Sequence, residues 1–251
     1  MSGAVCLWSI LLTSTTSTHA QPPQQPVSSS ATHTSERTVN KTFKSKYLLY
    51  LPEGYNEKKQ QWPLMMFLHS AGARGEKPEA IQAEGLPFLL TTGLKIPFIV
   101  VAPQCPADEW WDSRWSIETL SALLDDVAEK YNVDARRVYL TGWSMGGAGT
   151  WRFASEYPKR FAAIAPICGR SQLRYVPQLQ TTPVWAFHGE KDTIVPISES
   201  QKMVDSLKAA GGQARLALLK DVGHEAWREA YSDPRLYEWF LLHSKKQDDN
   251  N

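Results

Sequence analysis

The sequence predicts an α/β domain built around a mostly parallel sheet. Over residues 39–244, apolar runs of strand length alternate with longer segments whose apolar residues recur at helical spacing. Several of these runs are apolar without alternation, which is typical of strands covered on both faces. Alternating strands and helices predict a layered domain with one core. The predicted strands are residues 47–51, 64–68, 98–102, 138–141, 161–167, 184–187 and 216–219.

Helices are expected between these strands. Apolar residues recur at helical spacing from residue 117 to residue 131, with Ser116 as the predicted N-cap. Residues 198–201 form a capping-box pattern that predicts a helix start, and Gly211 is expected to end that helix. Apolar residues from 236 to 240 predict a final helix.

Length and charge narrow the class of protein. The chain has 251 residues, 42% of them hydrophobic and 21% charged, which is typical of one globular domain. Its 27 basic and 26 acidic residues leave a net charge of +1, which argues against a nucleic-acid partner. No apolar run approaches the roughly 18 residues that span a bilayer, so no integral membrane association is expected.

The two ends of the chain do not resemble the domain. Residues 1–20 hold a short apolar stretch and end in Ala20, a pattern typical of a secretory signal, which predicts a secreted or periplasmic protein. Residues 21–38 are rich in Pro, Gln, Ser and Thr and predict a flexible linker. Residues 245–251 predict a polar tail. Removal of the predicted signal would remove Cys6, which leaves two cysteines in the chain, Cys105 and Cys168.

The strongest chemical motif is the run Gly-Trp-Ser-Met-Gly-Gly at residues 142–147. It follows the predicted strand at 138–141 and precedes a helical stretch at 148–157. A G-x-S-x-G motif at a strand-to-helix turn is the nucleophile elbow, which exposes a serine hydroxyl on a strained turn. Ser144 is therefore the candidate nucleophile.

A serine hydroxyl needs a neighbouring base, and the base needs an acid to orient it. Asp192 and His224 follow Ser144 in the chain order typical of this motif, each just beyond a predicted strand. Glu190 and Asp221 are the competing acids, but Asp192 has the better spacing from its strand. The remaining histidines of the domain fit the base less well, because they lie before the acid or in the last helix: His69, His188 and His243.

Acyl transfer also needs backbone donors for an oxyanion. One donor is expected at Met145, the residue after the nucleophile. The second is expected in the loop at residues 69–75, which follows the strand at 64–68. No His, Cys and Asp cluster shows metal-ligand spacing, so neither a metal nor a cofactor is expected.

These motifs resemble the α/β-hydrolase superfamily. Within it the chain is similar to small secreted esterases grouped with dienelactone hydrolases, phospholipase/carboxylesterases and feruloyl-esterase-like enzymes, some of them described as predicted prolyl-oligopeptidase-type peptidases. The blocks that carry the resemblance are residues 47–55, 103–106, 140–147 and 166–169. The resemblance implies the α/β-hydrolase fold, with helices on both faces of the sheet and no large lid, because only residues 169–182 occupy the usual place of a lid.

The oxyanion loop departs from the family pattern. The family usually has His-Gly-Ala-Gly where this chain has His-Ser-Ala-Gly at residues 69–72. Serine tolerates unusual backbone angles less easily than glycine, so two alternatives stay open: Ser70 lowers the activity, or its hydroxyl adds a donor. Ala71 is the expected second donor, with Ser70 as the next candidate. The usual strand order places Cys105 and Cys168 three strands apart, which disfavours a disulfide.

The resemblance implies a serine carboxylesterase acting on a small-molecule or polymer-attached ester, with acylated carbohydrates and phenolic esters as candidate substrates. Four tryptophans flank the motif segments and are candidates to line the substrate pocket: Trp110, Trp111, Trp143 and Trp227. The alternatives are a serine peptidase of the prolyl-oligopeptidase type acting on short peptides, and a catalytically weak binding protein.

Overall fold

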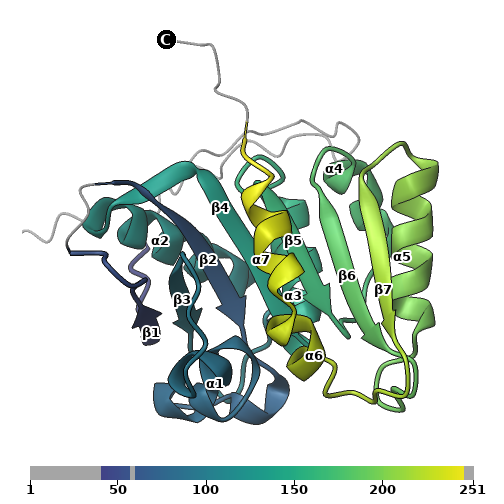
Figure 1. The fold of residues 1–251 in the computed structure, drawn as a ribbon, viewed down its shortest axis with the longest axis horizontal. Helices are drawn as coiled ribbons and strands as arrows, with labels where there is room; N and C mark the ends of the chain where they lie inside the picture. The colour runs from purple at the N-terminus through teal and green to yellow at the C-terminus, as the bar shows by residue number, and fades with distance from the viewer. Residues whose placement is uncertain (1–40, 57–59, 246–251) are drawn as a thin grey trace, which may run out of the picture. The chain divides into compact units, whose positions relative to one another are not determined.

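The sheet is the frame of the domain. The computed structural model describes residues 41–56 and 60–245, and from Thr42 onward these form one compact unit. The described part has seven strands in the order β1-β3-β2-β4-β5-β6-β7 (Figure 1). Only β1 pairs antiparallel; every other pairing is parallel, which confirms the predicted sheet. The strands are β1 (Tyr47–Tyr50), β2 (Trp62–Leu68), β3 (Ile99–Pro103), β4 (Val133–Trp143), β5 (Ala163–Ile167), β6 (Val184–Gly189) and β7 (Ala214–Leu219).

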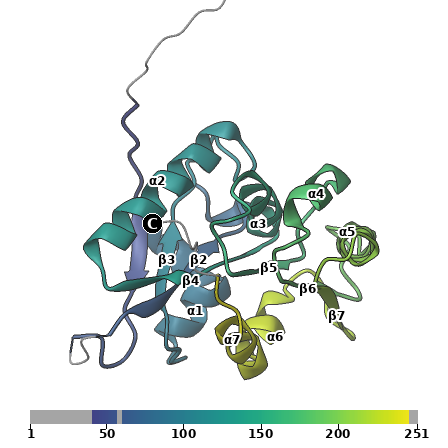
Figure 2. The same cartoon turned by 90° about the horizontal axis from the view of Figure 1, so that it is seen from above.

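Helices cover both faces of this sheet. Seen from above, α2, α3 and α5 lie on one side of the strands and α1, α6 and α7 on the other (Figure 2). The α-helices are α1 (Gly85–Thr91), α2 (Arg114–Lys130), α3 (Met145–Glu156), α4 (Val176–Leu179), α5 (Ser198–Ala209), α6 (Trp227–Ser232) and α7 (Pro234–Leu241). Three 3-10 helices complete the described part: η1 (Ala71–Ala73), η2 (Pro78–Ala83) and η3 (Leu173–Tyr175).

Because the sheet separates two helical layers, the domain has two hydrophobic cores where the sequence predicted one. Every residue of β2 is buried, and successive side chains enter opposite cores. Met66 and Leu68 pack toward α2 and α3, whereas Met65 and Phe67 pack toward α1, α6 and α7. This explains the apolar runs without alternation, since a strand buried on both faces has no side facing water.

Two predicted helix starts are wrong in detail. Helix α2 begins at Arg114, three residues earlier than expected, because Ser113 is the N-cap and accepts the N–H of Ser116 at 3.1 Å. Helix α5 begins at Ser198 with Ile197 as its N-cap, and no side chain caps it. The predicted capping box does not form there, because Ser198 is already the first helical residue and the Gln201 side-chain amide donates to Asp205 instead.

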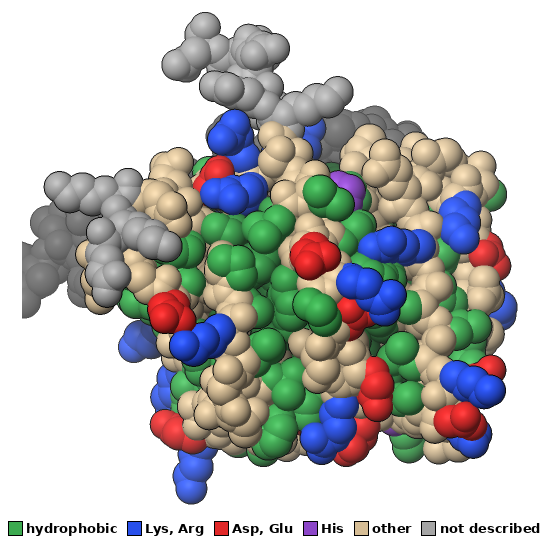
Figure 3. Space-filling model, in the orientation of Figure 1, with side chains coloured by type: hydrophobic (Ala, Val, Ile, Leu, Met, Phe, Trp, Pro, Cys, Tyr) green, Lys and Arg blue, Asp and Glu red, His purple; other side chains and the backbone are tan. Residues whose placement is uncertain are grey.

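Both cysteines of the described region are buried free thiols. They follow β3 and β5, which are three places apart in the sheet, as the expected strand order requires. The predicted signal, the linker and all of the tail but Lys245 lie outside the described residues. Within residues 41–56 and 60–245, no helix has both the length and the apolar character needed to cross a membrane. On the face shown in Figure 3, acidic and basic side chains are interspersed around a central group of hydrophobic ones.

Candidate active site

Ser144 lies on a sharp turn between a strand and a helix. It follows the last residue of β4, and α3 begins at the next residue, Met145. Its backbone has φ 58° and ψ −114°, a conformation that non-glycine residues rarely adopt. The turn is held by the Ser144 N–H, which donates to the Ile167 carbonyl at 2.9 Å. These features confirm the predicted strand–turn–helix context of the G-x-S-x-G motif.

Two glycines allow this turn to form. A Cβ at Gly146 would lie 1.8 Å from the Leu68 carbonyl oxygen, and one at Gly142 would lie 2.4 Å from the Gly146 carbonyl oxygen. Neither position therefore has room for a side chain. The backbone at Gly146 packs directly against the end of β2, which brings the serine turn beside the loop that follows Leu68.

Ser144, His224 and Asp192 form one hydrogen-bonded chain. Nδ1 of His224 lies 2.8 Å from Oδ2 of Asp192, and Nε2 of the same ring lies 2.8 Å from Oγ of Ser144. A carboxylate can only accept, so Nδ1 carries the proton and Nε2 is left to accept the serine hydroxyl. The competing acids lie elsewhere: Glu190 is exposed, and Asp221 forms an exposed ion pair with Lys191.

The carboxylate of Asp192 is fixed and ionised. Its Oδ1 accepts the N–H groups of Ile194 and Val195, both at 2.9 Å, and its side chain has no solvent exposure. Burial alone would raise the pKa of Asp192, but the His224 ring and these two N–H groups outweigh it and hold the pKa below its ordinary value. Asp192 therefore stays negatively charged beside the imidazole.

Behind Asp192 lies a buried cluster that the sequence analysis missed. Nε2 of His188 lies 3.3 Å from Oδ2 of Asp192, and the Cys168 Sγ is close to both. These ligand atoms lie within 4.8 Å of one another, close enough to hold a metal ion. Each already has another role, however: His188 is hydrogen-bonded to the Val195 carbonyl and to Ser200, and burial raises the pKa of the Cys168 thiol. The arrangement fits a support for Asp192 better than a metal centre.

The loop after β2 presents a second backbone donor. Nε2 of His69 accepts the Cys105 N–H at 3.0 Å, so its proton lies on Nδ1, which donates to the Ser70 carbonyl at 2.6 Å. Burial lowers the pKa of His69 to about 4, which keeps the ring neutral. Because the C=O and N–H of a trans peptide point in opposite directions, this bond turns the Ala71 N–H away from His69.

Ala71 and Met145 are both the first residue of a helical segment, η1 and α3 respectively. An N–H at that position has no acceptor within its own helix. Both residues line the same cavity as Ser144. The structure thus brings the two preferred oxyanion donors together beside the serine.

The backbone conformation and the hydrogen bonds of Ser70 decide whether it can act as a donor. Its φ of −74° and ψ of 173° are ordinary extended values, so the backbone at Ser70 is unstrained and glycine is not required. Its N–H donates to Oε1 of Glu84 at 2.7 Å, so it is not available to an oxyanion. The prediction of Ser70 as an alternative donor is therefore wrong.

A cavity of about 530 Å³ opens beside Ser144. It has a mostly apolar lining with two exposed charged residues, Asp112 and Arg170. Of the four tryptophans expected to line a pocket, Trp110 does so and is 49% exposed. The full lining is Ala71, Trp110, Asp112, Ser144, Met145, Ala148, Arg170, Ile194 and Val195.

The other three tryptophans are structural. Trp111 and Trp227 are only 2% and 1% exposed, because each ring packs into a hydrophobic core, and neither lines the cavity. Trp143 also lies outside the cavity lining, and its Nε1 donates to the His224 carbonyl at 2.7 Å. It thereby holds the backbone of the candidate base. For these three the pocket prediction is corrected, since proximity to a motif in sequence did not indicate which way a large ring points.

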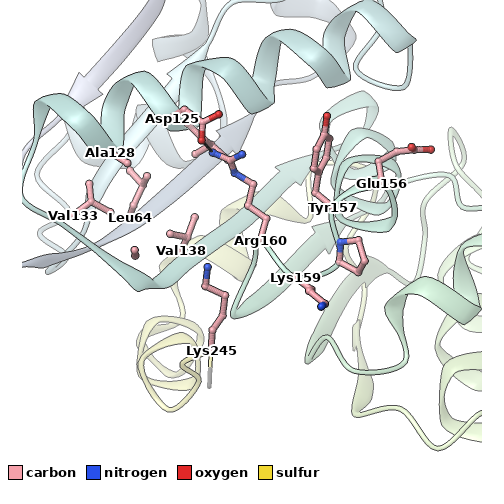
Figure 4. Close-up of a pocket in the computed structure, with 13 residues that line it drawn as sticks. Leu64, Asp125, Ala128, Val133, Val138, Glu156, Tyr157, Lys159, Arg160 and Lys245 are labelled. Atoms are coloured by element: carbon pink, nitrogen blue, oxygen red, sulfur yellow. Dashed lines mark hydrogen bonds and ion pairs between the residues drawn. The ribbon is translucent and has the colours of Figure 1, made fainter. Parts of the chain in front are cut away.

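A larger cavity, of about 620 Å³, lies at the other end of the strands (Figure 4). Its lining includes Leu64, Val133 and Val138 together with an ion pair between Arg160 and Asp125. It contains no serine, cysteine or histidine among its lining residues. The smaller cavity at Ser144 is therefore the candidate active site.

Comparison with known proteins agrees with this geometry. The profile of the dienelactone hydrolase family matches residues 108–235, just over half of the chain. The chain belongs to the dienelactone hydrolase family. Its fold is the α/β-hydrolase fold, shared with esterases of known structure. The crystal structure of a thermostable esterase matches with a TM-score of 0.68 at 29% identity, covering 79% of this family member and 59% of that chain.

Two curated proteins align with this dienelactone hydrolase family member over shorter stretches. The bifunctional acetylxylan esterase/xylanase of Neocallimastix patriciarum is 32% identical over 101 residues, 39% of this chain and 15% of that protein. The poly(3-hydroxyoctanoate) depolymerase of Pseudomonas fluorescens is 30% identical over 167 residues, 58% of this chain and 59% of that protein. The chain thus spans less than two thirds of either relative.

Proposed function

We propose that the protein is a serine hydrolase that cleaves carboxylic esters through an acyl-enzyme on Ser144. The observation that carries the proposal is the chain of two 2.8 Å hydrogen bonds from Asp192 through His224 to the Ser144 hydroxyl. A serine paired with a neutral ring nitrogen, whose other nitrogen is held by a carboxylate, is the arrangement that activates an alcohol for attack on a carbonyl.

Acylation follows from these positions. Nε2 of His224 takes the Ser144 proton while Oγ attacks the ester carbonyl, and the carbonyl electron pair moves onto its oxygen. The N–H groups of Met145 and Ala71 stabilise that oxyanion. When the electron pair returns, the bond to the alkoxy group breaks, and the protonated His224 gives its proton to the departing alcohol. Asp192 stabilises the positively charged imidazolium throughout this step.

Deacylation repeats the sequence with water. His224 takes a proton from a water molecule, whose oxygen attacks the acyl carbonyl on Ser144. The same two N–H groups hold the second oxyanion, and its collapse releases the acid and restores the serine hydroxyl. In this mechanism the residues of the site supply every proton transfer.

The cavity supports a substrate with a compact acyl group. The exposed ring of Trp110 and the side chain of Ile194 offer apolar surface beside Ser144, and Asp112 and Arg170 offer polar groups. We infer from this lining, and from the acetylxylan esterase among the relatives, that the substrates are esters of small acids on carbohydrate or polymer alcohols. We include phenolic esters among the proposed substrates, because an aromatic ring can stack on Trp110.

The test is hydrolysis of p-nitrophenyl esters from acetate to decanoate by the wild type and the Ser144→Ala variant. We expect turnover that is highest for short chains and is lost in the variant, whose melting temperature should match the wild type. Equal turnover by both proteins would refute Ser144 as the nucleophile. If the wild type cleaved short peptides and no ester, the same residues would serve a peptidase instead.

A further inference from the structure

Glu84 holds the loop that presents Ala71 to the substrate cavity. We propose that Glu84 is a positioning residue for the oxyanion site: its carboxylate fixes the peptide before Ser70, so that the Ala71 N–H faces the reacting carbonyl. This proposal rests on the proposed esterase function, because an oxyanion forms only if Ser144 attacks a carbonyl.

One carboxylate binds both the backbone and the side chain of Ser70. The Ser70 N–H donates to Oε1 of Glu84 and the Ser70 hydroxyl donates to Oε2, each at 2.7 Å. The same hydroxyl oxygen accepts the Gly72 N–H at 3.2 Å. Bonds of this length to an ionised acceptor are among the stronger hydrogen bonds in proteins, so the loop is held on both sides of Ala71.

The peptide between His69 and Ser70 is held at both ends. Its carbonyl accepts the Trp111 indole N–H at 3.0 Å, and its N–H is the one bound to Glu84. The next peptide is held at its carbonyl by Nδ1 of His69. Of the four polar groups in these two peptides, the Ala71 N–H is the one for which the described residues provide no hydrogen-bond partner. The loop is therefore organised around a single outward-facing donor.

The carboxylate reaches this loop from a rigid neighbour. Glu84 lies between η2 and α1, and Gly85 after it has φ +63°. A Cβ at Gly85 would lie 2.3 Å from the ring of Phe67, so the chain can pass this close to β2 only with glycine there. Leu86 then buries its whole side chain in the core beside α6 and α7. These contacts fix the backbone of Glu84 relative to the sheet and to the loop after β2.

Water is a poor substitute for this carboxylate. Ser70 is only 6% exposed, and burial raises the pKa of Glu84, with the hydrogen bonds from Ser70 opposing that shift and Glu225 adding to it. Removing the acceptor would leave the Ser70 N–H and the Ser70 hydroxyl proton buried without an acceptor. The loop would then relax toward other hydrogen bonds, and the Ala71 N–H would turn away from the oxyanion position.

The experiment compares Glu84→Met, which has similar length but no acceptor, with Glu84→Gln, whose amide oxygen can still accept the Ser70 N–H. Glu79→Met is the matched control, because Glu79 is an exposed residue of η2. The readouts are kcat and KM for p-nitrophenyl acetate and the inhibition constant of a trifluoromethyl ketone, which adds to serine as an oxyanion. Melting temperatures are measured alongside.

For Glu84→Met we expect kcat to fall about 10- to 100-fold, with KM within about twofold of the wild-type value. Complete loss of one oxyanion donor lowers kcat about 100- to 1000-fold, and the effect should be smaller here because the Ala71 N–H is misdirected and not removed. Affinity for the ketone should fall by the same factor. Glu84→Gln should recover most of both, and Glu79→Met should match the wild type. A Met variant with wild-type kcat and ketone affinity would overturn the proposal, as would equal losses in the Met and Gln variants.

Failure of the esterase function would look different. In that case the wild type itself would hydrolyse no ester, and no Glu84 variant could differ from it. The amide proton resonances of Ser70 and Ala71 would still report the tether, and we expect both to shift in Glu84→Met and to stay close to wild type in Glu84→Gln. Unchanged resonances in the Met variant would overturn the proposal without any measurement of activity.

Discussion

Replacing Asp192 with asparagine should disable the base without displacing it. Oδ1 of Asp192 accepts two backbone N–H groups, from Ile194 and Val195, so the asparagine oxygen is expected to take that place. Its NH2 group must then face Nδ1 of His224, where the structure has a carboxylate oxygen at 2.8 Å. Two donors cannot bond, so the ring adopts the tautomer with its proton on Nε2. That nitrogen can no longer take the proton of Ser144.

The size of the effect follows from the lost tautomer. We expect kcat for ester hydrolysis to fall by about 10³- to 10⁴-fold, or about 4–5.5 kcal/mol in the barrier, because a wrong tautomer removes general-base catalysis. The free energy of unfolding should fall by only about 1–3 kcal/mol, since one charge-assisted hydrogen bond is lost and the two backbone bonds remain. The loss of activity should therefore far exceed the loss of stability.

The pH dependence of this stability difference has a definite sign. The folded-state pKa of Asp192 lies below its ordinary value of 3.8, so its ionised form stabilises the fold above that pH. The difference in unfolding free energy between wild type and Asp192→Asn should therefore reach its maximum near neutral pH. It should shrink as the pH falls through and below 3.8.

The assay is steady-state hydrolysis of p-nitrophenyl acetate, with urea unfolding of each protein measured in parallel. Asp221→Asn is the matched control, because Asp221 is an exposed acid three residues before His224 and forms an exposed ion pair with Lys191. We expect the control to retain wild-type kcat. If Asp192→Asn kept more than about a tenth of the activity, or if both variants lost it equally, the assignment of Asp192 would be refuted.

Three further predictions concern packing. Gly146→Ala should abolish ester hydrolysis and lower the melting temperature, because its Cβ would lie 1.8 Å from the Leu68 carbonyl oxygen; a fully active variant would contradict the turn geometry. Trp227→Ala should cost about 3–5 kcal/mol of unfolding free energy in urea titration, whereas Trp110→Ala should change stability little but alter the acyl-chain preference; similar stability losses would contradict the burial difference. In a Cys6→Ser background, the two remaining thiols should react with a disulfide reagent only after unfolding, and reductant should not change the melting temperature; fast labelling of the native protein would contradict their burial.

Much of this site could be predicted because its signals are local. Ser144 lies two residues from each of the glycines that shape its turn, Gly142 and Gly146. Chain order, together with the spacing of each residue from its predicted strand or helix, distinguished Asp192 and His224 from the other acids and histidines. All seven strands were found, and four of them (β2, β3, β5 and β6) are buried along their whole length, which leaves a continuous apolar run in the sequence. These features depend on backbone conformation and on the side-chain composition of short segments.

The parts that were missed depend on contacts between distant residues. Nothing near Ser70 in the sequence indicates that Glu84, fourteen residues later, would bind its N–H and hydroxyl. The orientation of Trp227 toward a core was equally hidden, since a tryptophan beside a motif can point either way. His188 could have been suspected, because it is the second-last residue of β6 and lies only four residues before Asp192.

The most direct test of the account is to trap the acyl-enzyme. The protein would be mixed with p-nitrophenyl acetate, quenched in acid within the first turnover, digested with trypsin and analysed by mass spectrometry. We predict one acetyl group on Ser144, in the peptide that runs from residue 138 to residue 152, and none on the Ser144→Ala variant. Acetyl transfer to another residue with continued turnover, or turnover by the variant at the wild-type rate, would contradict the central claim that Ser144 is the nucleophile.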